Sequence, residues 1–133
     1  MRIFLDTNVL ISAFISRGLC ADLLRIIIAE YHLVVGDLVL SEMEKILSAK
    51  FNMPKKNVQN IISFLESFEK CVYNSEDSSI SLRDKDDEKI LAIALKSNID
   101  IFLTGDKDIL DARKEIPIKV LDPKEFLYLI KTK

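Results

Sequence analysis

Two aspartates placed directly after apolar runs are the residues of this sequence best suited to chemistry. Asp6 interrupts the run RIFLDTNVLISAF, and Asp106 follows the apolar segment IDIFL within Thr104-Gly105-Asp106. Burying an unpaired carboxylate is costly, so Asp6 must end a strand, cap a helix that begins just after it, or serve a site that needs negative charge. A tight turn is the simpler interpretation of the Thr-Gly-Asp segment.

Further acids fall at or near the starts of predicted helices. Glu42 lies in LSEMEKIL, and Asp84, Asp86 and Asp87 lie in RDKDDEK. Asp84 and Asp87 have the spacing of helix-capping residues, and a lone glutamate such as Glu42 is most often a solvated helix residue. Only the combination of these positions favours a shared site, and that combination depends on the elements that carry them.

Apolar periodicity predicts strands that alternate with helices along the whole chain. Strands are expected at residues 2–6, 32–35, 71–73, 99–104 and 118–121. Helices are expected at residues 19–30, 37–49, 54–68, 85–97, 107–114 and 123–131. Such alternation favours parallel pairing through right-handed crossovers, with helices on both faces of the sheet. The expected fold is therefore α/β, a three-layer α/β/α sandwich.

In such folds, ligands gather outside the carboxyl ends of the strands, where the strand order reverses. If the strands that end at Asp6 and Thr104 are neighbours, the carboxylates of Asp6 and Asp106 share one crevice. Two carboxylates ~4 Å apart repel each other by about 4 kcal/mol at an effective dielectric of ~20, so a positive group must lie between them. Hard divalent cations such as Mg²⁺ or Mn²⁺ suit oxygen ligands, whereas zinc is disfavoured because His32 is the only histidine. These ions assist phosphodiester hydrolysis, which is the predicted chemistry.

Composition is that of an ordinary globular domain, expected to span residues 1–133 as one unit. The chain is 49% hydrophobic and 30% charged, and its net charge of -2 creates no global basic field for nucleic acid. No apolar run approaches the ~18–20 residues of a membrane span, so neither a membrane segment nor a signal peptide is expected. Cys20 and Cys71 are expected to be buried free thiols, which indicates a cytoplasmic location. Residues 74–81 are expected to form a flexible loop.

Taken together, LDTNVLISAF, RDKDDEKILAIAL and IFLTGDKDIL resemble the motifs of PIN-domain nucleases, with a further acid in the helix after the second strand. The similarity is greatest to the VapC-related branch, the toxins of toxin–antitoxin pairs, and it covers the chain from Met1 to the helix PKEFLYLI. It implies a parallel sheet of about five strands, with the first strand central and beside the strand that ends at Thr104. It also implies RNA cleavage that depends on Mg²⁺ or Mn²⁺, and an antitoxin protein as a possible partner.

The resemblance also assigns roles to individual residues. The catalytic and metal-binding acids of the family fall on Asp6, Glu42, Asp87 and Asp106. Supporting positions fall on Thr7, Asn8, Thr104 and Asp108. Helical spacing does not choose between Glu42 and Glu44, and Asp84 and Asp86 remain alternatives to Asp87.

Basic residues near the expected crevice are candidates for phosphate contacts, although solvated surface charge is the simpler interpretation of each. These residues are Arg17, Lys55, Lys56, Arg83, Lys85 and Lys107. Helices 19–30 and 54–68 are candidates for a homodimer or antitoxin surface, with core packing as the simpler explanation. No feature predicts which RNA sequence is recognised.

Two other classes of function were weighed against a nuclease. A phosphate-transferring hydrolase or a receiver-like switch shares the α/β plan, but the aspartate-phosphatase pattern requires a second aspartate where Asn8 stands. The main alternative is a non-catalytic PIN-like module that binds nucleic acid or protein. Such a module is expected to have lost acids, whereas this chain keeps all four.

Overall fold

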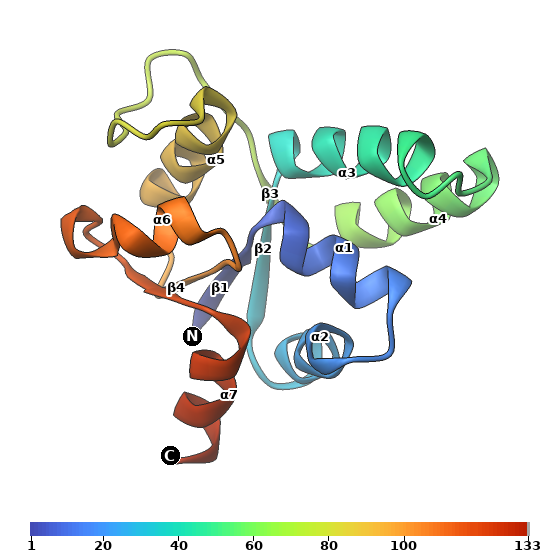
Figure 1. Ribbon diagram of the computed structural model, residues 1–133, viewed down its shortest axis with the longest axis horizontal. Coiled ribbons are helices and arrows are strands. Elements are labelled where there is room, and N and C mark those ends of the chain that lie inside the picture. Colours follow the sequence, from blue (N-terminus) through green and yellow to red (C-terminus); the bar gives the residue numbers. More distant parts are fainter. Residues whose placement is uncertain (133) are drawn as a thin grey trace.

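Five parallel strands form a single sheet in the computed structural model, which describes residues 1–132 (Figure 1). The strands are β1 (Arg2–Leu5), β2 (His32–Gly36), β3 (Glu69–Cys71), β4 (Ile101–Leu103) and β5 (Lys119–Leu121). Their order across the sheet is β3-β2-β1-β4-β5, and every pair is parallel. This arrangement confirms the predicted fold class, including the central position of β1 beside β4.

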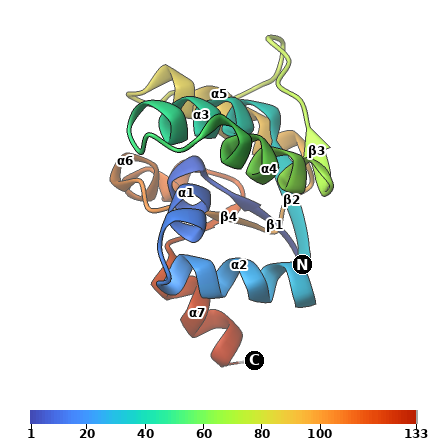
Figure 2. The same ribbon diagram turned by 90° about the vertical axis from the view of Figure 1, so that its right-hand side faces the viewer.

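Helices cover both faces of the sheet. They are α1 (Thr7–Ile15), α2 (Leu19–Glu30), α3 (Asp37–Ala49), α4 (Lys55–Glu66), α5 (Lys85–Lys96), α6 (Lys107–Asp111) and α7 (Pro123–Lys131). In Figure 1 the sheet is seen nearly edge-on, with α1 to α4 on one side and α5 and α6 on the other. Figure 2 looks onto the first of these layers, where α2 runs beside α7. Among the described residues, no helix has the length and apolar character needed to cross a bilayer.

The core is built around β1. Ile3, Phe4 and Leu5 are fully buried, and the ring of Phe4 stacks on that of Phe102 in β4 with centroids 5.4 Å apart. At the end of β2, a Cβ added to Gly36 would lie 2.9 Å from Cζ of Phe4. Gly36 therefore leaves the space that the Phe4 ring occupies against β2.

The carboxyl ends of β1 and β4 lie side by side. Leu5 is in register with Leu103, and the backbone N–H of Asp6 donates to the carbonyl oxygen of Leu103 at 2.9 Å. The chain leaves β1 toward β2 and β3, and it later returns to β4 and β5 on the other side. This is the strand-order reversal at which ligands bind in open α/β sheets.

Several sequence-based predictions need correction. The helix α1 was expected only as one interpretation of Asp6, as the cap of a helix that begins just after it, and the structure confirms this interpretation. The strand predicted at 71–73 lies at Glu69–Cys71, where it pairs with β2. The helix predicted at 107–114 ends at Asp111 and is followed by a 3₁₀ turn, Arg113–Glu115. The other predicted boundaries differ from the observed ones by at most two residues.

The predicted environment of the two cysteines was also partly wrong. Cys20 and Cys71 are free thiols, but both are half-buried rather than buried. Cys71 ends the edge strand β3, which has a neighbouring strand on one side only. Residues 74–81, expected to be a loop, contain no helix or strand.

Candidate active site

Asp6 joins the end of β1 to the start of α1 and is only 3% exposed. Its Oδ1 accepts a hydrogen bond from the backbone N–H of Thr7 at 2.8 Å. Its Oδ2 accepts one from the hydroxyl of Thr104 at 2.7 Å. Asp6 therefore caps a helix and also faces the neighbouring strand end. Ending a strand and capping a helix, two of the interpretations of Asp6 from sequence, are therefore compatible.

Thr104 connects Asp6 to Asp106. The Thr104 hydroxyl donates to Asp6 and accepts from the backbone N–H of Asp106 at 3.0 Å. Oδ1 of Asp106 then accepts from the backbone N–H groups of Asp108 at 2.8 Å and Ile109 at 3.2 Å, which caps α6. These bonds fix the backbone between the two acids, because a buried hydroxyl with both roles filled holds one orientation.

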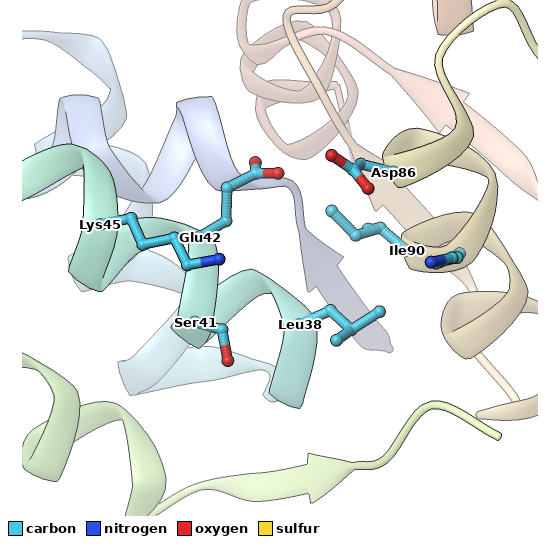
Figure 3. Close-up of a pocket in the computed structure, with 7 residues that line it drawn as sticks. Leu38, Ser41, Glu42, Lys45, Asp86 and Ile90 are labelled. Atoms are coloured by element: carbon cyan, nitrogen blue, oxygen red, sulfur yellow. The ribbon is translucent and has the colours of Figure 1, made fainter.

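The third group of acids lies at the start of α5. Oδ1 of Asp84 accepts from the backbone N–H of Asp86 at 2.8 Å, and a longer contact of 3.4 Å joins it to that of Asp87. Asp84 is thus the helix cap, as its spacing indicated. Asp87 is half-buried, whereas Asp86 is exposed. In Figure 3 the carboxylate of Asp86 lies across from that of Glu42 on α3.

Burial and the repulsion of neighbouring carboxylates raise the pKa values of two acids at this strand edge, Asp6 and Asp87. Burial, with the charges of Glu42 and Asp106, raises the pKa of Asp6 to about 6, although the bonds from Thr104 and Thr7 oppose the change. Burial raises the pKa of Asp87 to about 7, and the charges of Asp6, Asp106, Asp84 and Glu42 add to the effect. These four carboxylate positions, Asp6, Glu42, Asp87 and Asp106, therefore act on one another electrostatically.

The structure distinguishes Glu42 from Glu44, which the helical spacing does not. Glu42 is half-buried, and its charge acts on both Asp6 and Asp87. Glu44 is exposed and, with Ile62 and Glu66 of α4, lines a different hollow. Glu42 is accordingly the residue of α3 that belongs with the candidate site.

The donor atoms of this group suit a hard divalent cation, because all of them are carboxylate or hydroxyl oxygens. Within residues 1–132, however, no set of three or more Asp, Glu, His or Cys side chains is placed so that it could hold a metal ion. A site that supplies one or two carboxylates at a time fits Mg²⁺, which keeps several of its waters. The carboxylates therefore suit an ion such as Mg²⁺, which takes one or two of them as direct ligands and keeps water at its other positions.

The predicted supporting residues have different environments. The hydroxyl of Thr7 is buried and, in the described part of the chain, has no hydrogen-bond partner. Asn8 and Asp108 are exposed in the first turns of α1 and α6. Thr104 has the most direct supporting contacts, because its hydroxyl bonds to Asp6 and to the backbone of Asp106.

The predicted phosphate-binding residues are all exposed and lie on separate elements. Arg17 is in the turn between α1 and α2, Lys55 and Lys56 begin α4, and Lys107 begins α6 next to Asp106. Arg83 precedes α5, and Lys85 forms an ion pair with Glu88 at 2.8 Å. None of these residues lines the hollow that Glu42 and Asp86 share.

Two lysines outside the predicted set, Lys45 and Lys89, do line this hollow. A signal for them was present, because Lys45 follows Glu42 by three positions and Lys89 follows Asp86 by three. Residues three apart share one face of a helix. Each helix thus presents one acid and one lysine to the same space, and Figure 3 shows Glu42 and Lys45 on α3 facing Asp86 on α5.

Comparison with known families decides the relationship of this chain. The PIN domain model matches residues 2–108, which include all of the candidate acids. The chain belongs to the PIN domain family. A comparison with curated proteins gave no match.

Solved structures share the PIN fold at low sequence identity. VapBC2 from Rickettsia felis, bound to a DNA fragment from its promoter, matches with a TM-score of 0.67 and 18% identity, over 92% of this chain and 98% of that one. FitAB bound to the IR36 DNA fragment matches with a TM-score of 0.66 and 18% identity, over 91% and 94%. The PIN domain endonuclease Utp24 matches with a TM-score of 0.54 and 20% identity, over 91% and 84%.

Proposed function

We propose that this PIN-domain protein is a cytoplasmic endoribonuclease that hydrolyses RNA phosphodiester bonds with Mg²⁺ or Mn²⁺, and that it is the toxin of a toxin–antitoxin pair. The observation that carries the proposal is the placement of Asp6 and Asp106 at the neighbouring ends of β1 and β4, bridged by the Thr104 hydroxyl. Glu42 and Asp87, from two other parts of the chain, lie near enough to interact with them electrostatically. Gathering these acids is unfavourable for the protein alone, and strongly perturbed carboxylates at a strand-order reversal are typical of catalytic sites.

In this proposal Asp6, Asp87 and Asp106 hold the cation directly or through water, and Glu42 helps to hold it. When bound, such an ion lowers the pKa of water and neutralises charge on the phosphate. Thr104 holds Asp6 in place through Oδ2. Because the pKa of Asp87 is raised to about 7, this carboxyl group carries a proton for much of the time when no cation is bound near neutral pH.

Cleavage of a mixed-sequence RNA in Mn²⁺ buffer, with and without EDTA, tests the nuclease activity. We expect Asp6→Asn and Asp106→Asn to fold normally and to lose cleavage, whereas the matched variant Asp111→Asn, at the end of α6, keeps the wild-type rate. Wild-type cleavage by folded Asp6→Asn contradicts the site. Binding of Mn²⁺ or RNA by the wild type without any cleavage supports the non-catalytic interaction module instead.

The proposed toxin role is supported by the fold shared with VapBC2 and FitAB and by the VapC-like motifs. Expression of the wild-type chain is expected to arrest growth, and Asp6→Asn is expected to relieve the arrest. A small protein encoded next to this gene is expected to co-purify with the chain and to restore growth. Growth that is equally slow with wild type and Asp6→Asn contradicts a toxic nuclease. Sedimentation of the purified chain tests whether it also forms a homodimer.

A further inference from the structure

A hollow between α3 and α5 adjoins the candidate active site. Its volume is about 210 Å³, and the carboxylates of Glu42 and Asp86 lie on its two walls. Lys45 and Lys89 line the same hollow, one from each helix. Figure 3 shows the Lys45 ammonium group on α3 and the acids of both helices around this space.

Neither lysine is neutralised by a protein carboxylate. In residues 1–132, Lys45 and Lys89 form no ion pair, although Lys70, Lys85 and Lys96 all do. Even Glu42 and Asp86, one helical turn before them, lie outside ion-pair distance. The only other interaction found for either ammonium group in the described chain is a loose contact of Lys89 Nζ with the ring of Tyr73, 5.9 Å from its centroid.

We propose that Lys45 and Lys89 bind a backbone phosphate of the nucleic-acid strand next to the phosphate that is hydrolysed, so that the strand runs through the hollow between α3 and α5. This inference rests on the proposed nuclease activity. It names the binding residues that this activity needs, because a strand held only by acids and a cation has no other positive charge on its neighbouring phosphates.

The remaining lining of the hollow suits the same ligand. The hydroxyl of Ser41 can donate a hydrogen bond to a phosphate oxygen, and Leu38 and Ile90 provide apolar surface for a ribose or base. The residues favoured by sequence lie elsewhere. The far end of α3, Ala49, lies ~10 Å along the helix axis from Glu42 at 1.5 Å per residue, and Lys55 and Lys56 begin the next helix, α4.

The test compares Lys45→Gln, Lys89→Gln and the double variant with wild type and with Lys50→Gln. Lys50 is the matched control, because it ends the same helix, is exposed and lies outside the hollow. Two readouts are used: KM and kcat for cleavage of a short single-stranded RNA in Mn²⁺, and binding of the same RNA in EDTA over a range of KCl concentrations.

We expect the double variant to raise KM severalfold with kcat unchanged. We also expect the double variant to reduce the slope of log K against log salt by ~0.7, the value for one phosphate contact to a single strand. A fall in kcat at constant KM, or a slope equal to that of Lys50→Gln, overturns the proposal while leaving the nuclease intact. A wild type that neither cleaves nor binds RNA overturns the proposed function itself.

Discussion

Asp6 shows how one residue can cap a helix and also lie in a proposed active site. Its carboxylate is buried, yet both oxygens receive hydrogen bonds, one from the helix that it caps and one from Thr104. These bonds lower the cost of burial without removing it, since the pKa of Asp6 remains raised to about 6. The remaining cost is what a bound cation would relieve.

The first prediction concerns Thr104, whose hydroxyl holds Asp6 and the backbone of Asp106. Thr104→Val removes both bonds and leaves a buried carboxylate oxygen without its donor. We expect it to lower the free energy of unfolding by about 1–3 kcal/mol. Loss of an orienting partner also lowers cleavage by roughly 10- to 100-fold. Urea unfolding and initial rates measure the two effects.

Thr132→Val is the control for this variant, because the Thr132 hydroxyl bonds only to backbone carbonyl groups at the exposed end of α7. Surface changes of this kind stay within about 0.5 kcal/mol. If Thr104→Val unfolds at the same urea concentration as Thr132→Val, the Thr104 bonds contribute nothing to stability.

At the scale of elements, three helices begin at aspartates in or beside the candidate site. Asp6 caps α1, Asp84 caps α5 and Asp106 caps α6. The N-terminal ends of helices favour negative charge, so these helices offset part of the repulsion among the acids. The same arrangement points the first turns of α5 and α6 toward the end of β1.

Two variants of Asp84 separate its role as a helix cap from the effect of its negative charge. Asp84→Ala is expected to lower the free energy of unfolding by about 1 kcal/mol, because the N–H groups of Asp86 and Asp87 lose their acceptor. Asp84→Ser keeps a capping oxygen without the charge, and it should lose only a small fraction of this unfolding free energy. Urea unfolding compares the two variants. Equal losses contradict the capping role.

Gly36 tests the packing of β2 against the central strand. Gly36→Ala places a Cβ 2.9 Å from Phe4, so we expect it to destabilise the protein by about 1–3 kcal/mol. Gly105→Ala is the matched control, because a Cβ there meets no atom within 4 Å. Thermal unfolding measures both variants. A Gly36→Ala protein as stable as Gly105→Ala shows that the Phe4 ring moves aside freely.

At the scale of the whole molecule, acids from the two ends of the sheet respond to pH in opposite directions. At the carboxyl end of β1, the pKa values of Asp6 and Asp87 are raised to about 6 and about 7. At the amino end, a carboxylate oxygen of Glu69 lies 2.6 Å from the guanidinium group of Arg2 and the other lies 2.8 Å from the ring of His32. These contacts, that of Arg2 above all, lower the pKa of Glu69 to about 2. On folding, the affinity for protons thus increases at Asp6 and Asp87 and decreases at Glu69.

In EDTA, the stability of the protein is expected to rise as pH falls from about 7 toward 3.8, the unfolded value for aspartate, because folded Asp6 and Asp87 take up protons first. The contribution of Glu69 is present above its unfolded pKa of 4.5 and is lost as pH falls through about 2. Urea unfolding across this range is therefore expected to show a maximum in mildly acidic buffer.

Two comparisons check this prediction. The variant Asp6→Asn/Asp87→Asn is expected to lose the rise between neutral and acidic pH, whereas Asp111→Asn keeps it. Mn²⁺ at a hundred times its dissociation constant is expected to stabilise the wild type by about 2.7 kcal/mol at neutral pH, and the double variant far less. Stability that falls steadily from neutral pH downward contradicts the raised pKa values.

Local sequence determined most of the helices and strands, and it placed the acids at the carboxyl ends of strands and the starts of helices. Helices 19–30, 37–49 and 123–131 begin and end where their periodicity predicted, since a helix face and its caps are encoded within a few residues. For α1 the local signal was weaker, because the cap Asp6 precedes it but its buried residues Val9, Leu10 and Ile11 are consecutive and carry no helical spacing. Packing against α2 and α3 adds to the cap in making this segment a helix.

Tertiary structure alone decided which side chains meet. The different environments of Glu42 and Glu44, the pairing of β3 at Glu69–Cys71, and the convergence of Lys45 with Lys89 depend on how α3, α5 and the sheet pack. Sequence spacing places a residue on the face of its own element, but it carries no distance to a face that is formed many residues away. Those distances arise only when the buried faces of the elements close around β1.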